Sequence, residues 1–176
     1  MTAHAIPSRR RAWTVEPLLP HHGRAAFDWD VESLNVFLRH QAGQNAKKDF
    51  SRTFVAIPGE GSSEIIGYYT LPMSSLSFAE LPKEKHLPRY PVPIAPLGRL
   101  AVDLRYRGHH IGEHLLFHVL LRVQTLSEET GVLAVEVRAL DKAVSQFYIR
   151  HGFTLLADDP LHLYLTLKSI RKLALR

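Results

Sequence analysis

Apolar positions along this chain recur with two different periods, which separate strands from helices. Residues 52–57 and 64–71 are rich in β-branched and aromatic side chains, as strands are. A short glycine- and serine-rich segment joins them, so the pair is predicted to form a hairpin. From Ile111 onward the apolar residues recur at steps of four and three, which predicts an amphipathic helix to about Glu129. Gly131 is expected to end this helix.

Other segments extend this pattern on both sides. Residues 72–96 hold six prolines and are predicted to form a long loop rather than a regular element. Residues 168–176 are interpreted as a basic tail. The interleaved strands and helices predict one domain of the mixed α/β class. Strands are predicted at residues 13–18, 97–104, 132–137, 153–156 and 161–167, and helices at 30–38 and 141–150, with a second short helix or a loop at 42–48.

The composition is that of a globular protein with an excess of positive charge. The chain has 176 residues, enough for one domain with a full core, and a net charge of +5, which favours polyanionic partners. Residues 1–11 are predicted to be a flexible basic arm and residues 12–176 the folded domain. No apolar run approaches the roughly 20 residues that span a bilayer, and no apolar segment follows the arm. Neither a membrane partner nor a secretory signal is therefore expected.

Side chains that bind metals or form disulfides are scarce. The absence of cysteine excludes disulfides, thiolate zinc sites and a cysteine nucleophile, and it agrees with a reducing compartment such as the cytoplasm. Eleven histidines are present, but the adjacent pairs His21–His22 and His109–His110 are expected to point apart. No metal site is therefore expected.

A strand, a basic turn and a helix follow one another in the middle of the chain. The strand ends at about Leu104 and the helix begins near Ile111. The first backbone N–H groups of a helix have no partner within it, and together with the helix dipole they favour a bound phosphate. Gly108 and Gly112 let the backbone approach a ligand closely. The turn is therefore predicted to bind a phosphate group.

Two segments resemble motifs of the GNAT acetyltransferases. Residues 107–112, RGHHIG, resemble the pyrophosphate-binding pattern Arg/Gln-x-x-Gly-x-Gly/Ala, with His110 in place of the first glycine. Residues 143–153, AVSQFYIRHGF, resemble the pattern Ala-x-x-x-Phe-Tyr-x-x-x-Gly-Phe, whose tyrosine falls on Tyr148. The predicted order of strands and helices is also similar to that of this family.

The resemblance implies a single GNAT domain with about four helices and a mixed, mostly antiparallel sheet of about seven strands, splayed between its fourth and fifth strands. It also implies that acetyl-CoA enters this opening as cosubstrate, without a metal. Tyr148 would then donate a proton to the departing CoA thiolate. Asp141 stands where the family often has asparagine. The implied cofactor-binding residues are Leu100, Ala101, Val102, Arg107, Gly108, His109, His110, Ile111, Gly112, Asp141, Ser145 and Phe147.

No residue stands out as a general base for an acceptor amine. Asp103, Glu113 and Glu136 are interpreted as structural or solvated acids. An α-amino group has an ordinary pKa of about 8. Direct attack by the amine, with water taking its proton, would therefore suffice.

Four further stretches are similar to the TacT-type acetyltransferase toxins of toxin–antitoxin pairs, namely residues 52–55, 66–71, 91–94 and 97–103. This resemblance implies acetylation of the amino group of aminoacyl-tRNA, which would block translation. It also implies a homodimer and an antitoxin with a ribbon-helix-helix DNA-binding half. The candidate contacts to tRNA phosphates are Lys47, Lys48, Arg52, Arg89 and Arg99.

Two other functions fit the same residues. The chain could be a GNAT enzyme that acetylates a small amine or a protein N-terminus and has no toxin role. It could also be an inactive GNAT fold that binds nucleic acid or a partner protein. His110 in the predicted phosphate loop keeps this last alternative open, whereas the presence of Tyr148 argues against it.

Overall fold

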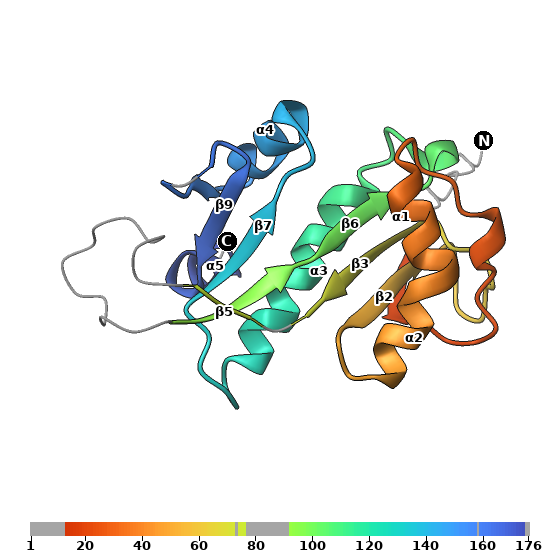
Figure 1. Cartoon of the computed structure of the whole chain (residues 1–176), viewed down its shortest axis with the longest axis horizontal. Coiled ribbons are helices and arrows are strands. Elements are labelled where there is room, and N and C mark those ends of the chain that lie inside the picture. The colour runs from red at the N-terminus through yellow and green to blue at the C-terminus, as the bar shows by residue number, and fades with distance from the viewer. Residues whose placement is uncertain (1–12, 73, 77–91, 158, 175–176) are drawn as a thin grey trace, which may run out of the picture.

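The structure, a computed structural model, describes residues 13–72, 74–76, 92–157 and 159–174 (Figure 1). The predicted arm at residues 1–11 lies outside the described residues. The strands are β1 (Thr14–Pro17), β2 (Arg52–Ile57), β3 (Gly67–Leu71), β4 (Ser74–Leu76), β5 (Val92–Leu97), β6 (Arg99–Val102), β7 (Ala134–Arg138), β8 (Thr154–Leu155) and β9 (His162–Thr166). The α-helices are α1 (Glu32–Val36), α2 (Ala42–Lys47), α3 (Ile111–Leu126), α4 (Lys142–Arg150) and α5 (Leu167–Ala174). Shorter helical turns are η1 (Arg24–Ala26), η2 (Phe37–Gln41) and η3 (Leu104–Tyr106).

The first sheet is antiparallel and has the strand order β1-β2-β3-β6. Its centre is the predicted hairpin, in which Arg52 pairs with Leu71. Helices α1 and α2 lie in front of this sheet in Figure 1, and α3 runs behind it. A buried cluster that includes Phe27, Leu38 and Tyr68 fills the space beneath α1 and α2. Both faces of the first sheet are therefore covered.

The second sheet has the order β4-β5-β7-β9-β8, and its β5–β7 pair is parallel. The prediction of an irregular loop at residues 72–96 is wrong at both of its ends, because β4 and most of β5 lie there; residues 77–91 lie outside the described residues. Proline lacks an N–H group but keeps its carbonyl, so it can still accept a ladder hydrogen bond. The carbonyl of Pro93 accepts one from the N–H of Leu133 at 2.8 Å.

One continuous stretch of chain passes from the second sheet to the first at Gly98. Before this residue β5 pairs with β7, and after it β6 pairs with β3. A Cβ atom at Gly98 would lie 2.8 Å from the Thr70 hydroxyl oxygen, so the crossing needs glycine. Because the chain leaves β7 at this point, β6 and β7 diverge (Figure 1). The predicted splaying between the fourth and fifth strands is confirmed.

Helix α3 is the shared support of both sheets. Its buried residues, which include Ile111, Leu115, Val119 and Val123, belong to the largest core cluster, together with residues of β3, β5, β7 and β9. The predicted helical spacing is therefore confirmed, although α3 ends at Leu126, earlier than expected. No helix in the described part of the chain has both the length and the apolar character needed to cross a membrane.

The interpretation of residues 168–176 as a basic tail is wrong for the described part of that segment. Helix α5 occupies it and packs against α3. Leu167 and Ile170 are buried, and Leu173 follows at the same step of three. The number of basic residues obscured this apolar periodicity, since one narrow stripe is enough to hold a short helix against a core.

Candidate active site

Asp103 anchors the turn between β6 and α3. Its buried carboxylate accepts hydrogen bonds from the backbone N–H groups of Arg105 (3.0 Å) and Asp28 (3.1 Å) and from the Arg105 guanidinium. Burial alone would raise the pKa of Asp103, but these hydrogen bonds outweigh burial and hold the pKa below its usual value of 3.8. Asp103 is therefore a charged anchor that ties the turn to the segment before α1.

Two residues of the turn have left-handed backbone conformations. Gly108 has a φ of +77° and His110 a φ of +58°. Such conformations suit glycine and disfavour residues with a Cβ atom. His110 thus adopts a backbone conformation that glycine adopts readily, and its N–H group remains in the loop.

A cavity of about 270 Å³ lies against this turn and the first residues of α3. The unpartnered N–H groups at the start of α3 and the positive end of the helix dipole lie at this cavity, which therefore suits a diphosphate. Arg107 is held beside it by an ion pair with Asp30 and by stacking over the Trp29 ring, at 4.6 Å. The lining residues are Trp29, Val102, Tyr106, Arg107, Gly108, His110, Ile111, Gly112, Glu113 and Phe147.

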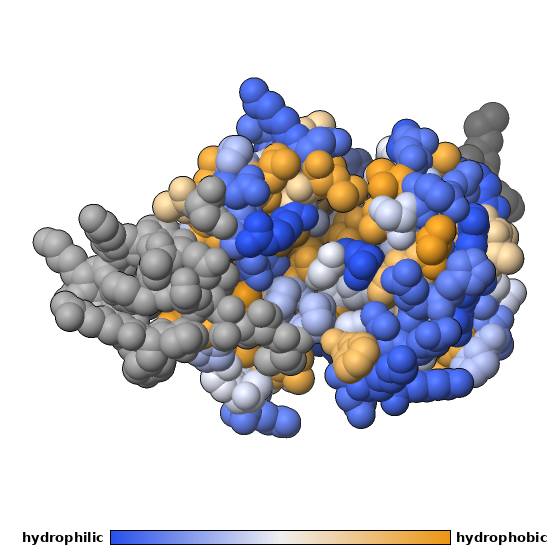
Figure 2. Space-filling view, viewed as in Figure 1, coloured by the Kyte–Doolittle hydropathy of each residue, from blue (hydrophilic) through white to orange (hydrophobic). Residues whose placement is uncertain are grey.

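A second, narrower cavity of about 70 Å³ occupies the opening between β6 and β7. Figure 2 shows apolar side chains at the bottom of the hollow between the two halves of the molecule. Trp29 lines this cavity as well as the first one, so the two adjoin. The lining residues are Trp29, Leu34, Leu97, Gly98, Arg99, Leu100, Val137, Arg138, Leu140, Val144 and Tyr148.

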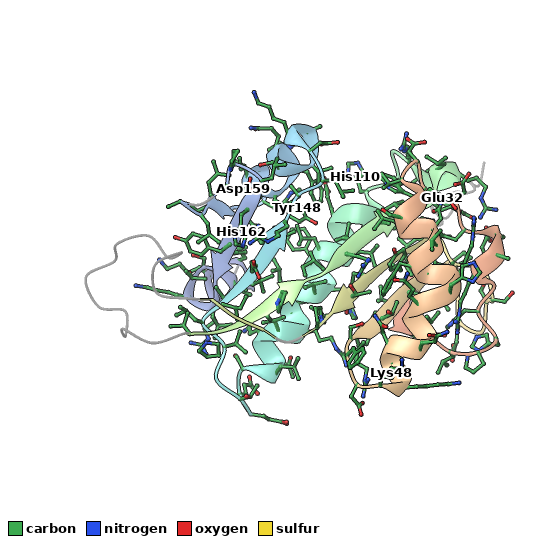
Figure 3. The ribbon with its side chains drawn as sticks, viewed as in Figure 1. Glu32, Lys48, His110, Tyr148, Asp159 and His162 are labelled. Carbon is green, nitrogen blue, oxygen red and sulfur yellow. The ribbon has the colours of Figure 1, made fainter. Side chains whose placement is uncertain are left out.

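Tyr148 reaches this second cavity from α4 (Figure 3). Its side chain is 4% exposed and packs against the rings of Phe147 and Phe153. Burial raises the pKa of Tyr148 well above its ordinary value of 10. The phenol is therefore protonated at neutral pH, as a proton donor must be.

The structure brings most of the predicted cofactor residues to these two cavities, but not all. Leu100 lines the narrow cavity, and seven others line the wide one: Val102, Arg107, Gly108, His110, Ile111, Gly112 and Phe147. Ala101 instead packs in the core beneath α1 and α2. His109 lines neither cavity. Asp141 caps α4 through the N–H of Val144 (2.8 Å), and the Ser145 hydroxyl donates to the carbonyl of Pro160.

The carboxylates considered as bases have structural partners. Glu136 is bonded to the buried ring of His162, and Glu113 lies 3.1 Å from the His110 ring nitrogen. Asp103 is held as described above. These contacts agree with the interpretation of these acids as structural or solvated.

Three of the candidate tRNA contacts lie together, and a fourth, Arg99, lies apart from them. Lys47 and Lys48 are exposed at the end of α2, and Arg52 lies close to them because its guanidinium donates to the carbonyl of Ala46. Arg99 lies apart, stacked over the Phe37 ring at 3.8 Å and lining the narrow cavity. Arg89 lies outside the described residues.

The expectation that His21 and His22 point apart is wrong, because their ring centroids are 4.1 Å apart. With Glu16 they form the one group found among the described residues that could hold a metal ion. His22 already accepts from the N–H of Leu19 and bonds to Glu16. Burial and the neighbouring His21 lower the pKa of His22. A neutral, structural His22 accounts for these contacts without a metal.

Comparison with known proteins bears on this geometry. The family model described as an acetyltransferase (GNAT) domain matches residues 50–155. The chain belongs to the GNAT acetyltransferase family. A tRNA-acetylating toxin of Mycobacterium tuberculosis is 34% identical over 150 residues, which cover 84% of this chain and 88% of that protein.

Two solved structures are also similar to this GNAT chain. The structure of AtaT complexed with acetyl-methionyl-tRNAfMet has a TM-score of 0.86 and 29% identity, and the match covers 93% of this chain and 99% of that one. A mutant AtaT toxin bound to the C-terminus of the antitoxin AtaR and acetyl-CoA has a TM-score of 0.80 and 26% identity, with coverage of 93% and 99%.

Several residues that line the narrow cavity were not predicted from the sequence. Trp29, Arg138 and Leu140 line the narrow cavity, yet they come from segments that show no recognisable motif. Trp29 precedes a predicted short helix, and the sequence offers no signal for it. Leu34 lies on α1, and the sequence offers no signal for its place in the cavity. These four residues line the narrow cavity, and Trp29 lines the wide one as well.

Proposed function

We propose that this chain is an acetyl-CoA-dependent N-acetyltransferase that acetylates the amino group of aminoacyl-tRNA and so blocks translation. The observation that carries this proposal is Tyr148, a buried and protonated phenol in the opening between β6 and β7. The adjoining cavity at the start of α3 has the backbone and charge that a diphosphate requires. The two cavities thus suit the diphosphate and the thioester of an acyl-CoA.

The cofactor would lie across both cavities. Its diphosphate would accept hydrogen bonds from the N–H groups of Gly112 and its neighbours, beside Arg107. Its pantetheine arm would enter between the diverging strands and pair with their free backbone groups, as an added strand would. This orientation would place the thioester near Tyr148.

The transfer itself needs only one protein acid. The acceptor nitrogen attacks the thioester carbonyl carbon, a C–N bond forms, and the C–S bond then breaks. The departing CoA thiolate takes a proton from the Tyr148 hydroxyl, which then regains a proton from water. The proton of the acceptor nitrogen passes to water, since the acids Asp103, Glu113 and Glu136 have structural partners.

Support for tRNA as acceptor comes from the charge and from the relatives. The chain has a net charge of +5, and the M. tuberculosis relative is a tRNA-acetylating toxin. We also propose a toxin that acts in the cytoplasm as a homodimer and is held inactive by an antitoxin with a ribbon-helix-helix half. The structure of AtaT bound to its antitoxin supports the proposal that this chain has an antitoxin partner. A solution mass of twice the 20.0 kDa of the chain would test the dimer.

The proposed acceptor is tested by incubating the protein with labelled acetyl-CoA and charged total tRNA. We expect label on the amino group of one or a few amino acids attached to tRNA. Uncharged tRNA is the control and should stay unlabelled. If only small amines or protein N-termini take up label, the chain is a GNAT enzyme of another specificity. If acetyl-CoA does not bind at all, the chain is an inactive binding module.

A further inference from the structure

Phe50 is the most exposed of the large apolar side chains that the described residues present to solvent, at 65%. Three other exposed apolar residues, Phe117, Leu121 and Leu173, line a common groove between α3 and α5, which is typical of a protein contact. Phe50 is not part of that groove. Its neighbours in the chain, Lys47 to Asp49, are all charged and exposed. The groove therefore does not account for its exposure.

The turn that carries Phe50 is firmly built. The N–H of Phe50 donates to the carbonyl of Asn45 at 2.9 Å, and the N–H of Lys48 donates to Gln44 at 3.1 Å. Asp49 adopts a left-handed conformation with a φ of +58°. Arg52 stabilises this turn, because its guanidinium donates hydrogen bonds to the Asp49 carboxylate and to the carbonyl of Ala46. The exposed ring is thus presented by a fixed backbone.

Two cations lie close to the ring. The Lys48 ammonium lies 6.0 Å from the centroid of the Phe50 ring, and Lys47 precedes it at the end of α2. Arg52 is paired with Asp49, so the two lysines are the cations left to contact an anion. An exposed aromatic ring beside cations is the arrangement that binds a nucleic acid base and the phosphates next to it.

We propose that Phe50 is a stacking surface for an unpaired base of the RNA acceptor, with Lys47 and Lys48 on the adjacent phosphates. This proposal rests on the proposed function and extends it to a second contact. Figure 3 shows Lys48 at the lower end of the molecule and Tyr148 at the upper part of the opening. The base therefore belongs to a part of the RNA away from the reacting amine. A small acceptor would not reach it.

The test compares Phe50→Leu, which keeps an apolar side chain but removes the flat ring, with Phe50→Tyr, which keeps the ring. For Phe50→Leu we expect the KM for charged tRNA and the Kd for uncharged tRNA to rise about tenfold, because base stacking contributes on that scale. The turnover number and the KM for acetyl-CoA should stay unchanged, as should the rate with a small aminoacyl amide. Phe50→Tyr should bind tRNA as the wild type does.

The salt dependence of tRNA binding distinguishes the contribution of the Phe50 ring from that of the two lysines. Replacing Lys47 and Lys48 with glutamine should weaken binding and also reduce the slope of log Kd against log salt, whereas Phe50→Leu should leave the slope unchanged. Wild-type affinity of Phe50→Leu for tRNA, in an enzyme that does acetylate charged tRNA, overturns the stacking role and leaves the function standing. A changed solution mass without a change in tRNA affinity makes Phe50 a protein contact instead. Failure of the wild type itself to bind or acetylate tRNA removes the proposed function.

Discussion

The two cavities of the opening are assembled in different ways. The wide cavity is built mostly from one continuous stretch, in which Val102, Gly108 and Gly112 follow within a strand, a turn and a helix start. The narrow cavity takes its lining from five separate parts of the chain, from Trp29 to Tyr148. The first depends on local backbone geometry, and the second on how distant strands and helices are packed.

This difference between the cavities corresponds to a difference between the groups that they are proposed to bind. A diphosphate is the same in every acyl-CoA, and backbone N–H groups of a short loop can bind it whatever side chains surround them. The thioester would lie at the narrow cavity, where the acceptor would have to reach it, and this cavity is lined by side chains such as Arg99, Arg138 and Leu140. The diphosphate region is therefore encoded locally, whereas the region of the proposed transfer is encoded by the packing of the whole fold.

Asp103 joins the two regions. It caps the turn of the wide cavity, and its second oxygen accepts from Asp28, the residue before Trp29. The N–H of Leu104 also donates to the carbonyl of Asp28 at 2.9 Å. Substitutions confined to the loop should thus affect acetyl-CoA binding alone, whereas substitutions at Asp103 should disturb the structure of both cavities.

The largest effect is expected for Gly112→Asp. The new carboxylate would extend into the wide cavity and repel the diphosphate, and like charges in contact cost several kcal/mol, so the Kd for acetyl-CoA should rise at least about 100-fold. Gly112→Ala is the matched control, because a Cβ atom there would make only ordinary contacts of 3.7 Å with Val102 and 3.9 Å with Phe147. Calorimetry measures both affinities. If both variants bind acetyl-CoA equally weakly, the added volume at this position, and not the negative charge, is the cause.

A smaller effect on stability is expected for Asp103→Ala. Unpaired buried donors cost about 1–3 kcal/mol, so the free energy of unfolding should fall by about that amount. Because the folded pKa of Asp103 lies below its usual value of 3.8, its contribution is complete only above about pH 5 and is lost as the pH falls through the folded pKa. Urea titrations between pH 7 and pH 3 should therefore show the difference between wild type and variant shrinking in acid. A difference that is constant with pH would rule out this role of the charge.

The smallest effect is expected for His110→Gly. Glycine removes the strain of a left-handed backbone in the folded state, but it also increases the conformational entropy of the unfolded chain. These two effects oppose each other, so the free energy of unfolding should rise by less than about 1 kcal/mol. Gly108→Ala, at a φ of +77°, should instead destabilise the fold. Thermal unfolding measures both. Destabilisation by His110→Gly would show that the imidazole, which contacts Glu113, matters more than the backbone.

The same contrast explains what the sequence could predict. The hairpin of β2 and β3, the phosphate loop and the motif of α4 rest on neighbouring residues, and their patterns are legible in one stretch. Strand β5 was missed because Pro93 suggests a break, whereas its pairing with β4 and β7 satisfies the backbone. Helix α5 was missed because its contact with α3 is a tertiary one. Trp29 could not be predicted because the cavities that it lines are formed by distant parts of the chain.

The most direct test of the account is Tyr148→Phe, assayed with acetyl-CoA and charged tRNA on one preparation. The variant keeps the ring and its packing against Phe147 and Phe153 and loses only the hydroxyl. We expect acetyl-CoA and tRNA to bind as in the wild type, while turnover falls about 100-fold, at the lower end of general acid catalysis. Since burial raises the pKa of Tyr148, the wild type should show no loss of activity from its deprotonation up to pH 10. A variant that acetylates charged tRNA at the wild-type rate would contradict the central claim.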